Sequence, residues 1–467
     1  MADRFLYFND ENFGLSELVA TLRGMSTSLY PVTVDLAHRG NPGSARLNGA
    51  TPNFVFEYDE LKKYHQIWIM AAETRLFSPI SDDERQAIRR FMDEGGGVFA
   101  TGDHEDLGVT VGGYIPRVRS MRRWFWPNPG PNGEPVAPHG GDATRHDTNR
   151  AGHDPGFSFN DQSDDVPQTI APRYFGGLIQ SVHPVLCTPQ GPIRVLPDHP
   201  HEGECVVPHN LGAHYSIGGH SEREYPDGPG GTPLPPVVIA TSTMIPGAET
   251  AGKPPVPGGT FGAIGAWDGH RAGAYGRIVV DATWHHFINI NLIGDRDLGL
   301  PNPAVPKTMG FLHTAAGQAH YDRIRTYFTN IANWLTPRSM RRCWLHRHIW
   351  WVTQHGWFLE NFRRDDLIQT GRLALELLGW LGPCERISFI HDLFYERELP
   401  VPWRGLLDPF AEDAAEIHKQ LRGVKREDAQ MLAKEMPEAM MGAAAVGFLE
   451  RDVSIDLLRN EIGDEEA

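Results

Sequence analysis

Cysteine is scarce in this chain of 467 residues, with four, at positions 187, 205, 343 and 384. No two form a CxxC pair and they are too sparse for a disulfide framework, so they indicate reduced thiols in a cytoplasmic protein. Long apolar runs are missing as well. The opening MADRFLYFNDENFG has no apolar h-region, and no segment reaches the roughly 18 consecutive apolar residues of a membrane-spanning helix. We therefore expect a cytoplasmic protein without a membrane partner.

Positive charge is in deficit, because 43 Lys and Arg stand against 59 Asp and Glu, a formal net charge of -16. This balance argues against the broad basic surface that nucleic-acid binding requires, so we expect no nucleic-acid partner. The sequence also has no GxSxG elbow, no Walker loop and no GxGxxG after the first expected strand. The partner that remains is a small-molecule substrate, either neutral, cationic or bound to a metal.

The first hundred residues alternate strand-like and helix-like patterns. An apolar run at 5–8, helical spacing at 15–25 and β-branched alternation at 31–37 precede the strand-like QIWIMA at 66–71. A capping box, SDDE at 81–84, then opens an amphipathic helix that ends at three glycines before a second buried strand. Such alternation predicts an α/β fold in which helices cover a parallel sheet.

The same pattern returns late in the chain, after an interval of different composition. Further strand-like and helix-like runs lie at 236–241, 261–267, 276–283 and 316–335. The interval, 109–235, is rich in Gly, Pro, Asp and His and has little periodicity. A structureless stretch of this length is unusual inside a compact domain. We therefore expect an irregular cap inserted into one α/β domain that spans 1–336.

The pattern beyond residue 336 is helical, and we expect a separate helical domain over 337–467. Seven of the chain's 12 tryptophans lie between positions 334 and 403. An aromatic stripe on one helix face is formed by Trp344, Trp351 and Phe358, which recur every seven residues. Such a stripe usually packs against the rest of the chain. A surface for a homo-oligomer or another partner is the alternative.

Two segments together resemble a known family. The helix, GGG turn, strand and polar tip at 82–104, with the late strand GRIVVDATWHH, resemble the class I glutamine amidotransferase-like superfamily, nearest its trehalose-utilisation (ThuA-like) branch. The resemblance covers 1–108 and 236–335. It implies a flavodoxin-like parallel sheet, with the cap as an insertion in it.

The resemblance also implies where catalytic groups would stand. Family enzymes with a triad carry a cysteine on the sharp turn after a central strand and a histidine after a late strand. In this sequence the turn carries Gly102, Asp103 and His104, and the cysteine nucleophile is missing. His285 or His286 matches the late histidine in position.

The polar tips of the two strands are the first candidate site. In an open parallel sheet, ligands bind beyond the carboxyl ends of the strands. Asp103 and His104 follow one strand at that edge, and Asp281, His285 and His286 follow another. We expect these groups to meet and to form the floor of a site. The alternative is that the carboxylates cap a turn and that His104 bonds to the backbone.

The motif LPDHPHEGEC at 196–205 is the second candidate. His199 and His201 are two residues apart, which places both imidazoles on one face of an extended chain. Glu202 adds an oxygen ligand or a general base beside them. The alternative is that histidines in a loop rich in Pro and Gly bond to nearby backbone groups. Cys205, activated by a neighbouring imidazole, is a candidate nucleophile, but the strand-like VVPH after the motif favours a core cysteine.

These patterns predict a hydrolase assisted by a divalent metal, zinc before others, that acts on an amide, ester or glycosidic bond. The expected metal ligands are His104, His199, His201 and His286, and the expected catalytic residues are Asp103, His285 and Glu202. A rival hypothesis is a non-catalytic module that binds a small molecule and signals to a partner through the aromatic helices. A third is metal-free acid–base chemistry by His285 with Asp103.

Overall fold

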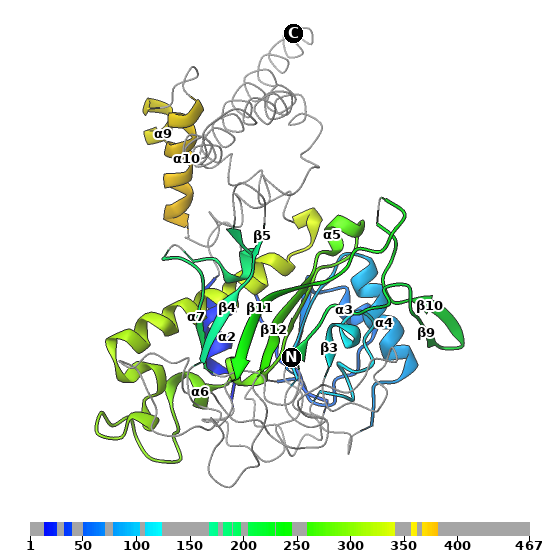
Figure 1. The fold of residues 1–467 in the computed structure, drawn as a ribbon, viewed down its shortest axis with the longest axis horizontal. Helices are drawn as coiled ribbons and strands as arrows, with labels where there is room; N and C mark the ends of the chain where they lie inside the picture. Colours follow the sequence, from blue (N-terminus) through cyan, green and yellow to red (C-terminus); the bar gives the residue numbers. More distant parts are fainter. Residues whose placement is uncertain are drawn as a thin grey trace, which may run out of the picture. The chain divides into compact units, whose positions relative to one another are not determined.

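Figure 1 shows the fold of the chain in a computed structural model. The structure describes residues 14–25, 32–39, 50–70, 78–102, 108–123, 168–175, 181–188, 190–197, 204–228, 230–244, 259–340, 356–361 and 367–381. The chain divides into two compact units. The first consists of 1–173 and 185–338, and the second of 174–184 and 339–467.

A seven-stranded sheet organises the first unit, in the order β1-β2-β13-β12-β11-β4-β7. The strands are β1 (Gln66–Ile69), β2 (Gly97–Ala100), β4 (Gln168–Pro172), β7 (Val195–Leu196), β11 (Val237–Met244), β12 (Gly259–Trp267) and β13 (Ile278–Asp281). β1, β2 and β13 are parallel, whereas each neighbouring pair from β13 to β7 is antiparallel. The α/β class is confirmed, and the sheet is mixed where a parallel one was expected.

The change of direction follows from the connections between strands. A parallel pair needs a crossover of about a dozen residues or more, usually a helix. Between β12 and β13 the chain has only residues 268–277, which include the short helix α5 (Gly269–Ala272), and β13 returns antiparallel to β12. The sequence marked these runs as buried strands, but burial on both faces carries no information on strand direction.

The helices of the first unit are α2 (Ser16–Gly24), α3 (Tyr58–Leu61), α4 (Asp82–Asp93), α5, α6 (Asn289–Ile293) and α7 (Ala315–Leu335). Three of them, α2, α4 and α7, lie close to their expected places, and three short ones were not expected. Short 3-10 turns are η2 (Arg119–Met121), η4 (Pro184–Leu186), η5 (Trp284–His286), η6 (Pro306–Thr308) and η7 (Gly310–His313). The predicted capping box starts α4: Ser81 Oγ accepts from Glu84 N at 3.2 Å, and Glu84 accepts from Ser81 N at 2.9 Å. Helix α4 is followed by Gly95, whose φ of 100° favours glycine.

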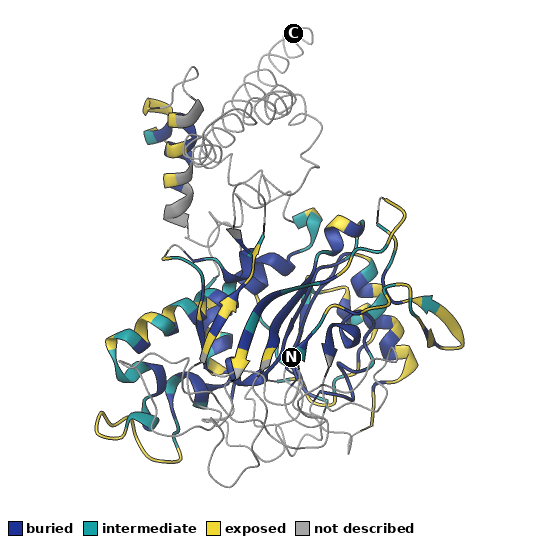
Figure 2. Ribbon diagram, viewed as in Figure 1, coloured by how far each residue is buried: buried dark blue, intermediate teal, exposed yellow. Residues whose placement is uncertain are grey.

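Helices α4 and α7 cover opposite faces of the parallel strands (Figure 1). On one face, Val98 and Ala100 belong to a core cluster that includes apolar residues of α4. On the other, the rings of Phe99 and Phe287 have centroids 5.0 Å apart, and Phe287 packs on Phe328 of α7 at 5.2 Å. Alternate residues of β2 thus face opposite layers, and all of its residues are buried. Figure 2 shows that buried residues are concentrated in the sheet.

The described part of the expected cap contributes to the sheet and its surroundings. β4 and β7 extend the sheet beyond β11, while β3 (Arg122–Arg123) pairs with β8 (Glu204–Cys205). β9 (His214–Ile217) and β10 (His220–Arg223) form a hairpin. These strands have two to five residues, too few for alternation to distinguish them from loop. The expectation of a wholly irregular cap is therefore not met in this part of the chain.

A buried ion-pair network ties this hairpin to the core. Glu224 accepts from Arg119 at 2.7 Å and from Arg117 N at 2.6 Å. Arg117 has a φ of 68°, an uncommon conformation for a residue other than glycine, and its guanidinium pairs with Asp93 of α4 at 2.8 Å. These bonds hold three elements together: the hairpin, helix α4, and the turn that precedes β3.

In the second unit the described residues form β5 (Tyr174–Phe175), β6 (Ser181–Val182), α9 (Gly356–Asn361) and α10 (Leu367–Leu381). Both helices lie within runs that the sequence pattern predicts as helical, and Phe358 of the expected stripe is buried. Trp344 and Trp351 lie outside the described residues, so the stripe and the helical domain over 337–467 stay predictions. Within the part of the chain that the structure describes, no helix is long and apolar enough to cross a membrane.

Candidate functional site

Two neighbouring parallel strands, β2 and β13, end together at one edge of the sheet. Ala100 of β2 and Val280 of β13 are the last register pair of the two strands. The next residues, Thr101 and Asp281, therefore lie side by side. Both are fully buried. Segments that lie far apart in the sequence therefore meet where the polar motifs begin.

Asp281 accepts hydrogen bonds from three groups at this edge. His286 Nδ1 lies 2.9 Å from Oδ2, the hydroxyl of Tyr327 donates to the same oxygen at 2.6 Å, and Thr283 N donates to Oδ1 at 3.2 Å. All four residues are fully buried. A carboxylate removed from water is stabilised by such charge-assisted bonds. Because a carboxylate only accepts, this contact assigns the proton of the neutral imidazole to Nδ1.

Tyr327 links this group to helix α7. Its burial, reinforced by the Asp281 carboxylate, raises the pKa of the phenol well above the usual 10.0. The hydroxyl therefore stays protonated over the physiological range and donates to Asp281. His286 is in this way fixed by a carboxylate that is itself held from a second element.

His285 is held by a different set of contacts. Its Nδ1 lies 3.0 Å from Asn291 Oδ1, and its backbone N–H donates to Thr283 Oγ1 at 3.1 Å. Thr283 is the N-cap of η5, which carries both histidines. The ring stacks obliquely on Trp284, with centroids 4.9 Å apart. Two adjacent imidazoles are thus oriented by different oxygen acceptors.

Cys205 lies against the ends of these strands. Its thiol donates to the carbonyls of Val280 at 3.4 Å and Ala263 at 3.5 Å. Burial raises the pKa of the thiol well above the usual 9.0, the Asp281 carboxylate adds to the rise, and the Arg122 guanidinium opposes it. A thiol that stays protonated is a poor nucleophile. The core role that the strand pattern favours is therefore confirmed by its burial.

Arg122 brings a positive charge to the same edge. Its side chain is buried, and Nη1 donates to the carbonyl oxygen of Thr101, the residue that follows β2. The guanidinium is placed by β3, which pairs with β8. The edge therefore combines an acid, two imidazoles and a guanidinium within a largely buried environment.

Most of the other expected site residues are not placed. Asp103, His104, His199, His201 and Glu202 lie outside the described residues. Of the expected ligands and catalytic groups, the structure places His285 and His286, on consecutive positions of η5. The expected meeting of all these groups in one pocket stays a prediction.

The placed histidines suit a metal in one respect. Each is fixed through Nδ1 by a side-chain oxygen, as metal-bound imidazoles commonly are, so coordination would use Nε2. In the described ranges, no group of three or more His, Cys, Asp and Glu side chains is arranged to hold a metal ion. A complete zinc shell would therefore need ligands from other parts of the chain.

Sequence reasoning missed Tyr327, Asn291 and Arg122. Tyr327 stands in an amphipathic helix, where a tyrosine is usually read as core with its hydroxyl at the surface. Asn291 and Arg122 belong to segments without strong periodicity. The sequence did carry one signal that Asp281 would have hydrogen-bond donors. Asp281 is the last residue of an apolar strand, and a carboxylate that is buried at the end of a strand needs donors.

Comparisons with known proteins leave the family open, since no protein-family model, no curated protein and no solved structure matches the chain. The described residues define an α/β protein with a mixed sheet. Its particular feature is a buried Asp–His pair where two parallel strands end.

Proposed function

We propose that this chain is a metal-assisted hydrolase whose centre lies where β2 and β13 end. The observation that carries the proposal is the buried Asp281–His286 pair, supported by Tyr327. A bound zinc ion would lower the pKa of a water and polarise the carbonyl or glycosidic oxygen of the substrate. The proposed substrates contain an amide, ester or glycosidic bond.

Each placed side chain has a definite role in this proposal. Asp281 accepts from His286 Nδ1 and so turns Nε2 towards coordination or proton transfer. Tyr327 holds the carboxylate in place from α7. His285 serves beside His286 as a general acid or base, oriented by Asn291.

The remaining residues enter the proposal from the sequence. Asp103 and His104 come directly after Thr101 and Gly102, at the end of β2. The proposed ligands His199 and His201 and the proposed base Glu202 immediately precede β8, which lies against β12. Both connections support convergence on the edge that carries His286.

Metal analysis tests the proposal directly. Protein purified without added zinc is expected to contain about one zinc ion per chain. His286→Gln is expected to lose it, while His214→Gln, on the exposed hairpin strand β9, retains it. Circular dichroism confirms that each variant is folded. Zinc-free wild-type protein, or full retention of zinc in His286→Gln, would contradict the proposed metal centre.

A second test uses the carboxylate behind the histidine. Asp281→Asn keeps the size of the side chain but weakens its hold on His286 Nδ1. Loss of such an outer partner is expected to lower zinc affinity or hydrolysis of chromogenic esters, amides or glycosides about 10–100-fold. Thermal unfolding provides the control for folding. An unchanged rate and zinc content in a folded variant would remove Asp281 from the mechanism.

We also propose that the parallel strands belong to a flavodoxin-like, class I glutamine amidotransferase-like domain that lacks the cysteine nucleophile. The support is the order of helix α4, glycine turn and β2, with histidines directly after β13. The sparse cysteines support a cytoplasmic location. If metal and hydrolysis are both missing, a non-catalytic module that binds small molecules becomes the better hypothesis.

A further inference from the structure

Arg122 is a buried arginine at the edge where β2 and β13 end. Its Nη1 donates to the carbonyl oxygen of Thr101, and the N–H of Thr101 donates to the carbonyl oxygen of Ile69 in β1 at 3.0 Å. Both backbone polar groups of Thr101 thus have partners: a neighbouring strand holds the N–H, and a side-chain cation holds the carbonyl. A guanidinium withdrawn from water is stable only where hydrogen bonds replace its hydration, so this contact also helps to hold Arg122 in place.

Gly102 makes room for this guanidinium. A Cβ atom built on Gly102 would lie 1.9 Å from Nη2 of Arg122 and 2.4 Å from its Cζ. The φ angle of Gly102 lies outside the left-handed region, so the backbone there does not itself require glycine. The guanidinium therefore takes the place that a side chain would have, and it lies directly against the backbone where the chain leaves β2.

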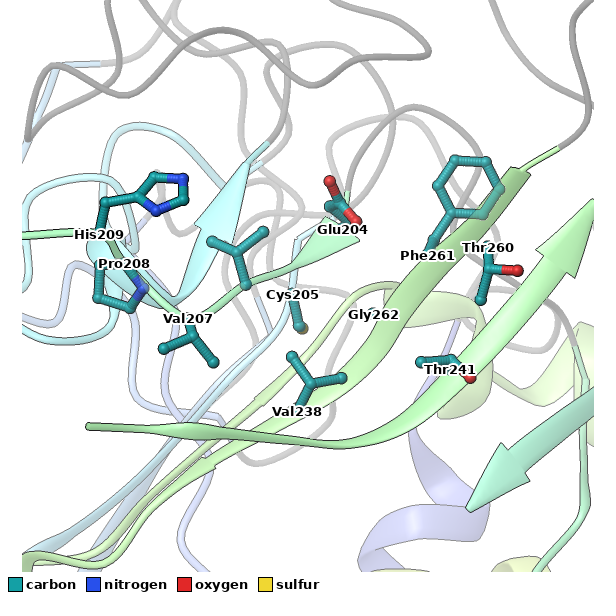
Figure 3. Close-up of a pocket in the computed structure, with 11 residues that line it drawn as sticks. Glu204, Cys205, Val207, Pro208, His209, Val238, Thr241, Thr260, Phe261 and Gly262 are labelled. Carbon is teal, nitrogen blue, oxygen red and sulfur yellow. The ribbon is translucent and has the colours of Figure 1, made fainter. Parts of the chain in front are cut away.

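The backbone of Arg122 is fixed to the same edge by a second route. Arg122 pairs with Cys205 in the register of β3 and β8, and the thiol of Cys205 donates to the carbonyl of Val280 in β13 at 3.4 Å. A Cβ atom built on Gly262 would lie 1.9 Å from the carbonyl oxygen of Cys205, so β8 crosses β12 where β12 has no side chain. Figure 3, a close-up of the cavity beside β8, shows Cys205 next to Gly262. Strand β8 therefore sets β3 against the sheet, and Arg122 reaches the end of β2 from there.

Arg122 thus meets the parts of the chain that carry the proposed centre. The carbonyl that it holds belongs to Thr101, which lies beside Asp281 where β2 and β13 end. In the sequence, Asp103 directly follows the glycine that the guanidinium covers, and Glu202 stands two residues before β8, with which β3 pairs. Loss of the guanidinium would free the end of β2 to move relative to Asp281. A displacement of about 1 Å at a catalytic centre can cost about a hundredfold in rate.

We propose that Arg122 is a positioning residue of this centre. Its guanidinium fixes the peptide group between Thr101 and Gly102 beside Asp281, and so sets the direction in which the chain leaves β2. Gly102 serves the same purpose, because it leaves the space that the guanidinium occupies. The functional part of this inference rests on the proposed hydrolase, whereas the positioning of the strand end can be measured without zinc.

Zinc affinity, measured by competition with a chelator, is the first test. Arg122→Ala is expected to weaken zinc binding about 10–100-fold, as loss of an outer partner does. Arg122→Lys is expected to weaken it as well, because an ammonium lacks the planar fork of a guanidinium. Added methylguanidinium should restore the zinc affinity of Arg122→Ala, and methylammonium should not. The matched control is Arg117→Ala, which removes another buried arginine, paired with Asp93 of α4, and should bind zinc as wild type does.

A double variant separates positioning from a simple loss of stability. Gly102→Ala is expected to push the guanidinium from its place, and so to weaken zinc binding in the same way as Arg122→Ala. Once the guanidinium is absent, the added methyl group has nothing to displace. The double variant is therefore expected to match Arg122→Ala without further loss, and methylguanidinium should no longer restore its affinity. Circular dichroism checks that each variant is folded.

Amide hydrogen exchange gives a readout that does not depend on zinc. In zinc-free protein, the Thr101 amide is expected to exchange about tenfold faster or more in Arg122→Ala than in wild type, because a hydrogen bond from a charged group no longer holds this strand end. In Arg117→Ala, Thr101 should exchange as in wild type. If the wild-type protein binds no zinc, the hydrolase proposal fails, and the exchange of Thr101 alone decides on Arg122.

The inference would be overturned by exchange of Thr101 at the wild-type rate in a folded Arg122→Ala variant. Wild-type zinc affinity in that variant, where the wild type binds zinc, would overturn it as well, and so would losses that add up in the double variant. If Arg122→Ala does not fold, Arg122→Lys and Gly102→Ala take its place in both measurements.

Discussion

The buried acidic side chains that the structure describes each have specific donors. Asp281 is held by His286 and Tyr327, and Glu224 by Arg119 and a backbone N–H. Glu84 follows the same rule at the start of α4. At the scale of single residues, stability therefore depends on charge-assisted bonds that respond to pH.

Glu84 gives a prediction for acid stability. Burial alone would raise its pKa, but hydrogen bonds from Arg39, Ser81 N and Phe56 N outweigh it and hold the pKa below the usual 4.5. The folded chain thus binds this proton less readily than the unfolded one. The stabilisation is complete above pH 4.5 and is lost as the pH falls through the lowered pKa of the folded state.

Glu84→Gln is accordingly expected to lower the free energy of unfolding by about 1–3 kcal/mol at pH 7 and by less in acid. Urea unfolding from pH 7 to pH 3 measures the difference. Asp83→Asn, an exposed neighbour in the same turn, is the control and should show a small effect. If Glu84→Gln lowers the free energy of unfolding equally at pH 7 and at pH 3, the lowered pKa of Glu84 is not the source of the stabilisation.

The two described cysteines should resist alkylation in the folded protein. Burial raises the pKa of Cys187 to about 11 and that of Cys205 well above 9.0, and only the thiolate reacts readily. Peptide mass spectrometry after iodoacetamide treatment at pH 8 should find both unmodified, and both modified in denaturant. Rapid labelling of native Cys205 would instead revive the nucleophile hypothesis.

Single residues also show the limit of sequence reasoning. The place of His285 and His286 at the end of a strand was predictable, because an apolar run with a polar end is visible in the sequence. Their partners Tyr327 and Asn291 were not, since nothing in a helical or aperiodic segment shows which polar group turns inward.

Among the elements, a clear period or a continuous apolar run decided what could be predicted. Helices α4 and α7 show a helical period, and strands β1, β2, β11, β12 and β13 were recognised from their apolar runs. The short strands β3, β7 and β8 were missed. Their places are set by contacts with other strands rather than by their own residues.

Strand β8 and its crossing of β12 give a prediction at this scale. Gly262→Ala would put a methyl group against the carbonyl of Cys205, and backbone at that distance must move. The expected cost is about 1–3 kcal/mol in the free energy of unfolding, as for other overpacked cores. Gly230→Ala is the control, because a Cβ there meets nothing within 4 Å.

Thermal and urea unfolding of the two glycine variants measure this cost. If Gly262→Ala is as stable as Gly230→Ala, β8 does not pack on β12 as the structure has it.

At the scale of the whole molecule, the division into two units predicts that the sheet does not need the C-terminal residues. The sheet, α4 and α7 all belong to the first unit. A chain that ends at Arg338 is expected to unfold cooperatively, with a midpoint within about 5 °C of the first transition of the full chain. Differential scanning calorimetry measures both. A truncated chain without a cooperative transition would show that the first unit depends on the second.

The overall architecture was predictable in class but not in topology. Alternating strand-like and helix-like runs identified an α/β protein. They could not show that β12 reverses direction, because an apolar strand buried on both faces has the same composition in either orientation.

The pairing of β2 with β13 also has a consequence for synthesis on the ribosome. About 180 residues separate the two strands in the sequence. Chains are synthesised at about 5–20 residues per second, so the edge of β2 that pairs with β13 stays without its neighbour for about ten to forty seconds. During this interval one hydrogen-bonding edge of an apolar strand is open to other chains. A nascent chain stalled before Ile278 should therefore aggregate or recruit chaperones, whereas one released after Asp281 has left the exit tunnel can close the sheet.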